Sequence, residues 1–185
     1  MTKQQIFWIA VCLLAISFIA ISFTKESEPI IEKYEIVEQD LFEEAVQVII
    51  DHEGWHTEKH FPYIGYGHKV VKGEKLDHTI SEQEAVELVR KDLRQKCAVF
   101  REFGKDSLLL GVLAYNIGEY KLIKPDGTPK SNLVKKLKAG DRDIYDEYVS
   151  FRKAWGRVIP SIERRRITEY NTLFDKVYVT RRELN

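Results

Sequence analysis

The sequence predicts a mostly helical α+β domain with one small β-hairpin and a buried central helix, placed after an N-terminal apolar helix. Three observations lead to this prediction. Apolar residues recur at helical spacing through most of the chain beyond residue 40. One segment, 60–71, combines glycine and proline with residues that favour strands. An uncharged run, 6–23, comes before both and is about as long as a membrane-spanning helix.

Composition narrows the classes of function. The chain has 185 residues, 44% of them hydrophobic, which suits one compact domain with a core and a short appendage. The formal net charge is zero, so no overall positive field attracts nucleic acid, and no nucleic-acid partner is expected. Beyond the apolar run Cys97 is the only cysteine, and we expect it to be a buried apolar residue on its helix.

The N-terminal run predicts a location in the cell envelope. Lys3 precedes it and the next basic residue is Lys25, which favours an N-terminus inside the cytoplasmic membrane and the remaining chain outside. We expect residues 1–23 to be a retained signal anchor, with a cleaved signal peptide and export to the periplasm as the alternative. Residues 24–38 show little periodicity and are expected to form a linker.

The folded domain is expected over residues 39–176, before a C-terminal tail, 177–185. Its first helix is predicted to begin at an N-cap, Asp40, and to end at Glu53-Gly54. The apolar stripe of this helix comprises Leu41, Phe42, Ala45, Val46, Ile49 and Ile50. Glu53 is therefore expected at the C-terminal end of the first helix, just before the hairpin of 60–71.

Later elements are predicted from capping residues and apolar runs. Ser81 and Glu84 form a capping box that opens a helix, and the apolar run 108–117, closed by Gly118, predicts the buried central helix. The apolar face of the helix after Ser81 is expected to include Ala85, Leu88, Val89 and Cys97.

After a loop over 121–130, Ser131 and Asp141 are predicted N-caps of two short helices. Pro160-Ser161 precedes a last helix. Its apolar face is expected to comprise Ile162, Ile167, Tyr170, Leu173 and Phe174.

Residues 52–68 support two chemistries. His52-Glu53-x-x-His56 has the spacing of a zinc protease, which requires both histidines on one face of an unbroken helix. Gly54 lies between them where the apolar stripe stops, which favours the end of a helix there. The alternative chemistry is that of a carboxylic acid at a helix end, which protonates a glycosidic oxygen across a cleft.

The order of helix, Glu53-Gly54 and Tyr-Ile-Gly-Tyr-Gly-His at 63–68 resembles the phage-type lysozymes, the muramidases known as endolysins. Further segments resemble later parts of that family in the same order, so that the similarity covers residues 38–175. These segments are 80–85, 113–118, 131–141 and 159–166. The resemblance implies a lysozyme-like fold, a peptidoglycan hydrolase that cleaves the β-1,4 bond between N-acetylmuramic acid and N-acetylglucosamine, and no metal or cofactor.

Residue roles follow from the resemblance. Glu53 takes the position of the general acid, and His68 and Asp92 take positions of a structural ion pair. Tyr63 and Tyr66 are candidate contacts to the sugar. Other positions have more than one possible role. Asn116 is expected to take part in the hydrogen bonding of the central helix, and Trp55 and Trp155 are expected to pack in the domain rather than stack on sugars. The arginines at 164–166 either place a guanidinium near Glu53 or carry surface charge.

The chain departs from the family at the second catalytic group. The family places an aspartate and a threonine after the glutamate, where they position the water or nucleophile. The same distances here lead to Pro62 and His68, and no aspartate occurs between residues 52 and 75. Glu58 is the candidate replacement, with Thr57 and His60 as alternatives and a solvated loop carboxylate as the simpler interpretation of Glu58.

This departure leaves a second function open, in which a weak or inactive lysozyme fold binds peptidoglycan within an envelope assembly. The expected partners are peptidoglycan glycan strands and the cytoplasmic membrane. Secretion, conjugation and lysis machineries are further possible partners, since each must open the wall locally.

Overall fold

A computed structural model of the protein describes residues 28–174. The predicted anchor, 1–23, and the predicted tail, 177–185, lie outside the described residues. The chain divides into two units, Met1–Asp40 and Leu41–Asn185, and the second holds the elements described below from Leu41 onward. Within residues 28–174 no helix is both long and apolar enough to cross a membrane.

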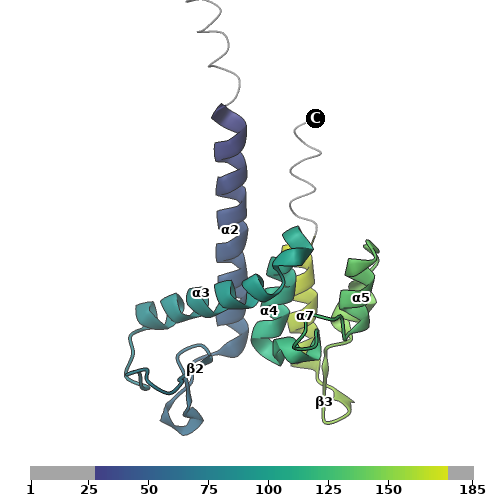
Figure 1. The fold of residues 1–185 in the computed structure, drawn as a ribbon. Coiled ribbons are helices and arrows are strands. Elements are labelled where there is room, and N and C mark those ends of the chain that lie inside the picture. Colours follow the sequence, from purple (N-terminus) through teal and green to yellow (C-terminus); the bar gives the residue numbers. More distant parts are fainter. Residues whose placement is uncertain (1–27, 175–185) are drawn as a thin grey trace, which may run out of the picture. The chain divides into compact units, whose positions relative to one another are not determined.

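The first described helix, α2, spans Glu28–Glu53 (Figure 1). The prediction that Asp40 caps its start is wrong, because the helix passes through Asp40 without a break. Pro29 falls in the first turn of α2, where the missing N–H of proline costs no helical hydrogen bond. From Leu41 onward the predicted apolar stripe is confirmed, since its members are buried in the core or packed against it.

The helix α2 ends at a glycine and leads into the first hairpin. Gly54 has φ 67°, a left-handed conformation that favours glycine and ends the helix. The predicted hairpin is present as two antiparallel strands, β1 at Tyr63–Ile64 and β2 at His68–Lys69. A short 3₁₀ helix, η1 at Glu58–His60, connects α2 to the hairpin.

Two packed helices form the centre of the domain. The helix α3, Glu82–Val99, begins with the predicted capping box, in which Ser81 Oγ accepts from Glu84 N–H at 3.2 Å. The 3₁₀ helix η2, Arg101–Asp106, leads into α4, Ser107–Ile117, whose middle is buried on all sides as predicted. The Cys97 thiol packs against this core, and burial raises its pKa to about 11.

Two short helices follow the 3₁₀ helix η3, Glu119–Lys121. The helix α5, Asn132–Lys138, has the predicted N-cap, with Ser131 Oγ accepting from Val134 N–H at 3.2 Å. The prediction that Asp141 caps the next helix is wrong: α6 spans Tyr145–Val149. The Asp141 carboxylate instead accepts from the N–H of Asp143 at 2.9 Å, an Asx turn in the connecting loop.

The structure has a second hairpin that the sequence did not predict. Strands β3, Lys153–Ala154, and β4, Arg157–Val158, pair antiparallel through a turn at Trp155-Gly156. Both turn residues have positive φ, 50° and 76°, as a tight two-residue hairpin turn requires. Tryptophan is rare in that conformation, so the turn is not recognisable from the sequence. Figure 1 shows both hairpins on the same side of the domain.

The last helix, α7 at Pro160–Leu173, buries charged residues in addition to part of its predicted apolar face. Ile162 and Ile167 are only partly buried. The residues of α7 that are fully enclosed are Arg165, Arg166, Glu169 and Leu173. The predicted apolar face is therefore confirmed for Leu173, Tyr170 and Phe174, which lie in the core or pack against it, whereas buried charges that were not predicted occupy the middle turns of the helix.

Gly65 allows close approach of the first hairpin to α3, and its replacement tests that contact. A Cβ at Gly65 would lie 2.7 Å from the Cβ of Ala85, and its φ is 54°. We expect Gly65→Ala to cost about 1–3 kcal/mol for overpacking in addition to about 1–2 kcal/mol for the left-handed backbone. Gly127→Ala is the matched control, with φ 81° and no atom within 4 Å of its Cβ position. Equal losses for the two variants in urea unfolding would contradict the close packing.

Candidate active site

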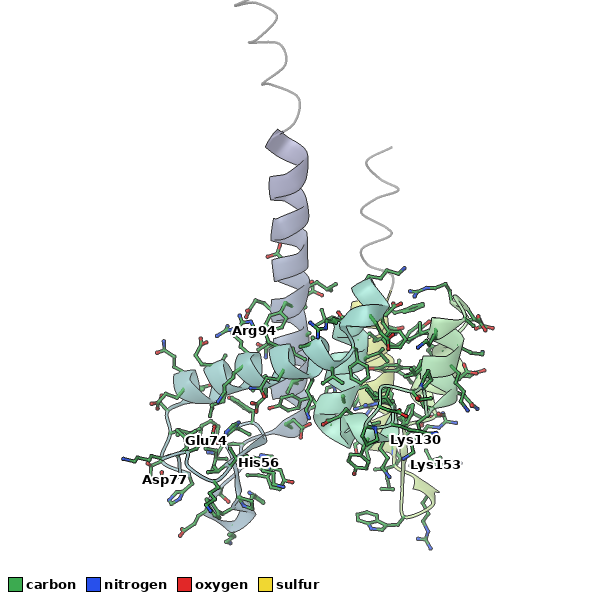
Figure 2. All side chains as sticks on the ribbon, viewed as in Figure 1. His56, Glu74, Asp77, Arg94, Lys130 and Lys153 are labelled. Carbon is green, nitrogen blue, oxygen red and sulfur yellow. The ribbon has the colours of Figure 1, made fainter. Side chains whose placement is uncertain are left out.

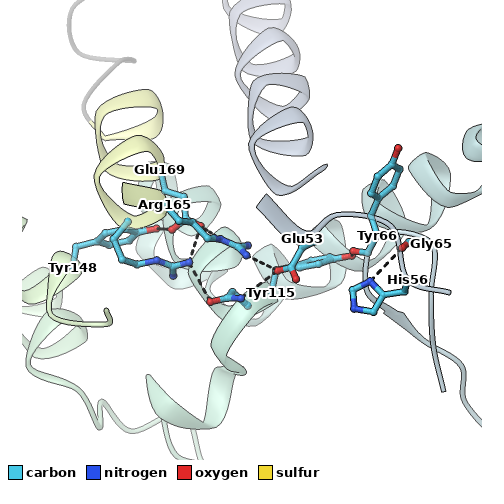
Figure 3. Close-up of polar contacts among 10 residues, drawn as sticks. Glu53, His56, Gly65, Tyr66, Tyr115, Tyr148, Arg165 and Glu169 are labelled. Atoms are coloured by element: carbon cyan, nitrogen blue, oxygen red, sulfur yellow. Dashed lines mark hydrogen bonds and ion pairs between the residues drawn. The ribbon is translucent and has the colours of Figure 1, made fainter. Parts of the chain in front are cut away.

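Glu53 lies at the last residue of α2, with its side chain only 17% exposed. Its Oε1 accepts hydrogen bonds from Arg165 Nη1 at 2.7 Å and from Asn116 Nδ2 at 3.2 Å (Figure 3). Its Oε2 accepts no hydrogen bond within the described residues and lies 3.8 Å from the position of a Cβ on Gly67. One carboxylate oxygen is thus held by the protein and the other is free.

Arg165 belongs to a buried network that crosses from α7 to α4. Glu169 Oε1 accepts from Arg165 Nε at 2.8 Å and from Arg166 Nη2 at 2.9 Å, and Tyr148 donates to Glu169 Oε2 at 2.9 Å. The i, i+4 and i, i+3 spacings place both arginines beside Glu169 on the inner face of α7. Two guanidinium groups therefore meet the carboxylates of Glu169 and Glu53, and their charges balance.

Electrostatics within this network favours the charged arginine next to Glu53. Burial opposes the charge of Arg165, but the carboxylates of Glu53 and Glu169 raise its pKa above the ordinary value. Burial also lowers the pKa of Arg166, although the nearby charge of Glu169 acts in the opposite direction. At the surface of the site, burial and then the charge of Arg165 lower the pKa of His52.

Asn116 joins this network rather than the hydrogen bonding of its own helix. Its Nδ2 donates to Glu53 and its Oδ1 accepts from Arg166 Nη2 at 3.2 Å. The favoured interpretation of Asn116 is therefore wrong. The arginines at 164–166 were expected either to place a guanidinium near Glu53 or to carry surface charge. Arg165 places its guanidinium next to Glu53.

The hairpin supplies the opposite side of the site. His56 pairs with Gly65 across an isolated β-bridge, and its half-buried ring lies 5.1 Å from that of His60 and 6.2 Å from that of Tyr63, measured between centroids. Atoms of Glu53, His56 and Tyr115 each lie 3.8 Å from the position of a Cβ on Gly67. Because this position carries no side chain, the three groups surround an open spot.

The helical geometry of a zinc protease is not formed. Gly54 ends α2 between the two histidines, so that His52 lies on the helix and His56 lies beyond it, paired with Gly65 next to the hairpin (Figure 2). In the part of the chain that the structure describes, no three histidine, cysteine, aspartate or glutamate side chains gather as a metal site.

The sequence candidates for a second catalytic group lie on η1. Glu58 is exposed there and makes no hydrogen bond or ion pair with Glu53. His60 Nδ1 accepts from the N–H of Thr57 at 2.9 Å, which caps the short helix. Glu58 stays a prediction, without a contact that supports it.

His68 is buried between two carboxylates. Its Nδ1 lies 2.7 Å from Asp92 Oδ2, the predicted partner, and its Nε2 lies 3.1 Å from Glu74 Oε2. Each ring nitrogen of His68 therefore lies within hydrogen-bond distance of a carboxylate oxygen. Glu74 was not predicted, because it lies in an irregular loop without a motif. These contacts connect β2, α3 and the loop that follows the hairpin.

A cavity of about 760 Å³ reaches two neighbours of Glu53, Gly67 and Asn116, but Glu53 itself is not among its lining residues. It extends from Gly67 and Asn116, the neighbours of Glu53, along β2 and α3 to the residues after α4. Its aromatic walls are Tyr63, Tyr115 and Tyr120. Tyr66 is not part of these walls: its hydroxyl donates to Glu82 at 3.1 Å, and its ring packs edge-on against Trp55.

Sequence comparison assigns this domain. The Phage lysozyme family model matches residues 50–169. The chain belongs to the phage lysozyme family. The predicted family and fold class are thereby confirmed, and membership supports a lysozyme-type glycosidase that acts on peptidoglycan, outside the cytoplasm. A search of curated proteins found no match.

Two solved structures share the fold. One is the endolysin from Escherichia coli O157:H7 phage FAHEc1, with a TM-score of 0.55 and 19% identity, covering 71% of this chain and 90% of that one. The other is the muramidase domain of SpmX from Asticaccaulis excentricus, with a TM-score of 0.56 and 19% identity, covering 70% of this chain and 94% of that one. At this identity the likeness concerns the fold.

Removal of Glu169 tests the buried network. We expect Glu169→Ala to lower the free energy of unfolding by about 3–5 kcal/mol, because two buried guanidinium groups lose their shared partner. Glu163→Ala is the matched control on the same helix: it also pairs with an arginine, Arg152, but is 33% exposed, and about 1 kcal/mol or less is expected. Equal urea midpoints for the two variants would contradict the network's role.

Acid sensitivity tests the carboxylates around His68. Hydrogen bonds from the Val71 N–H, His68 and Lys91 lower the pKa of Glu74 from 4.5 to about 2. Because the unfolded chain takes up this proton first, the contribution is complete above pH 4.5 and is lost as the pH falls towards 2. Glu74→Gln should therefore flatten the fall of the urea midpoint over that range. An unchanged slope would show that Glu74 does not contribute.

Proposed function

We propose that the protein is a muramidase that cleaves the β-1,4 bond between N-acetylmuramic acid and N-acetylglucosamine, with Glu53 as the general acid. The observation that carries the proposal is the asymmetry of the Glu53 carboxylate. Its Oε1 is bound by Arg165 and Asn116, while Oε2 accepts no hydrogen bond within the described residues and lies near Gly67, which lines the cavity. A general acid needs this arrangement, because one oxygen fixes the group and the other carries the transferable proton.

The chemistry follows from the position of Oε2. Its proton passes to the glycosidic oxygen as the bond from that oxygen to the anomeric carbon breaks, and positive charge develops on the sugar ring. Arg165 and Asn116 keep the carboxyl group in place, since both donate to the same oxygen. Water then bonds to the anomeric carbon, and no cofactor is needed for any of these steps.

The cavity walls suit a glycan strand. Tyr63 and Tyr120 are 42% and 60% exposed and line the cavity, so each offers an aromatic face on which a sugar ring can stack. Lys121 lies over the ring of Tyr120, with its Nζ 5.5 Å from the centroid. Of the two predicted sugar contacts, Tyr63 and Tyr66, only Tyr63 lines the cavity, so Tyr63 is the better supported. The role of Tyr66 as a sugar contact stays a prediction, and the hydrogen bond from its hydroxyl to Glu82 of α3 favours a structural role.

The proposed place of action is outside the cytoplasmic membrane. This part of the proposal rests on the uncharged run 6–23 and on the position of lysine residues around it. A retained anchor restricts where glycan is cut, which suits a local role in a lysis, secretion or conjugation machinery.

The activity is tested with the full chain on purified cell walls. Glu53→Gln keeps the shape of the side chain but has no transferable proton, so release of reducing sugar should fall by about 10²–10⁴-fold. Glu58→Gln, assayed alongside, shows whether that carboxylate takes part. A metal chelator and His52→Ala should leave the activity largely unchanged.

Other outcomes would replace this proposal. If the unaltered chain releases no reducing ends but sediments with cell walls, the protein is a lysozyme fold that binds peptidoglycan without cleaving it. Loss of activity with the chelator would indicate a metal-dependent reaction.

A further inference from the structure

We infer that His56 is the second catalytic residue of the site, the general base that takes a proton from the attacking water. The inference rests on the proposed function of Glu53 as the general acid. It accounts for a chain in which no aspartate occurs between residues 52 and 75.

The hairpin holds His56 in a defined position. Its backbone N–H donates to the carbonyl oxygen of Gly65 at 2.7 Å, and its Nδ1 lies 3.3 Å from the same oxygen. Its ring is half-buried between those of His60 and Tyr63. Figure 3 shows His56 with its contact to Gly65 on the hairpin side of Glu53, and Arg165 on the other side. A general base needs such fixed placement.

The contact with Gly65 determines which ring nitrogen is free. A carbonyl oxygen only accepts hydrogen bonds, so Nδ1 must carry the proton that the Gly65 oxygen receives. In the neutral ring Nε2 is then the unprotonated nitrogen, and it accepts no hydrogen bond within the described residues. Nε2 is therefore available to accept a proton from water.

The separation of His56 and Glu53 is short enough for one water to bridge them. The Cε1 atom of His56, which is bonded to Nε2, and the Oε2 atom of Glu53 each lie 3.8 Å from the Cβ position at Gly67. They are consequently no farther apart than twice that distance. Inverting glycosidases place their acid and base about 6.5–9.5 Å apart to admit a water between them. A side chain at Gly67 would occupy part of this space.

The other polar residues between α2 and the end of the hairpin are less suited to the role. Glu58 is exposed and has no contact with Glu53. His60 is exposed, and its Nδ1 is already occupied by the Thr57 N–H. Tyr63 presents its ring to His56. His56 alone among these candidates has an atom at the open spot that Glu53 Oε2 also faces.

The proposed step balances in atoms and charge. Glu53 gives its proton to the leaving sugar hydroxyl, and the water oxygen forms the new bond to the anomeric carbon. One water proton passes to Nε2 of His56 and the other stays on the new hydroxyl. The imidazolium then returns its extra proton through solvent to the Glu53 carboxylate, which restores both groups.

The test compares histidine variants of the full chain for release of reducing sugar. We expect His56→Ala to lower kcat by about 10²–10⁴-fold, the contribution of general base catalysis. His78→Ala is the matched control, an exposed histidine in the loop before α3, and should keep the parent activity. Added imidazole should restore activity to His56→Ala and not to Glu53→Gln, because only the former lacks an imidazole.

A second variant separates chemistry from folding. His56→Asn retains an N–H group that can donate to the Gly65 carbonyl but has no basic nitrogen. It should unfold at the urea midpoint of the parent and still be inactive. Activity of both His56 variants within a few-fold of the parent, with Glu53→Gln inactive, would overturn the role of His56 and leave the muramidase proposal standing. Absence of activity in the parent would overturn both.

Discussion

The ion pair between Glu53 and Arg165 joins two parts of the chain that are 112 residues apart in sequence. Its geometry depends on Glu169, which is fully buried and binds both Arg165 and Arg166. Because a buried charge is costly without partners, α7 must pack so that all of these groups meet. The position of the Glu53 carboxylate therefore follows from the packing of α7 as much as from α2.

Both sides of the site are positioned by charge. On the hairpin side His68 contacts both Asp92 of α3 and Glu74. On the other side Glu169 binds Arg165, which in turn binds Glu53. Buried ion pairs contribute little net stability compared with apolar packing, but they tolerate few alternative arrangements. Under the proposed mechanism that property has a use, since the acid and the base must keep a separation that admits one water.

Local signals explain which elements were predictable. The Ser81 capping box and the apolar run of α4 each specify their structure within a few residues, and the structure has both. Asp141 has a cap-like sequence but satisfies its carboxylate in a turn. The start of α2 was not predicted, because the residues around Pro29 show little apolar periodicity, and the turn at Trp155 was not predicted, because tryptophan rarely adopts positive φ.

The sequence by itself determined that Glu53 ends a helix in front of a glycine-containing hairpin, and through its motifs it identified the family. Those features depend on neighbours in the chain and on the order of segments. Only the tertiary structure decided which polar groups face the carboxylate: Arg165 and Asn116 on one oxygen, with His56 near the other. The physical reason is that these contacts arise between elements, so local propensity does not distinguish Arg165 from Arg164, or His56 from His60.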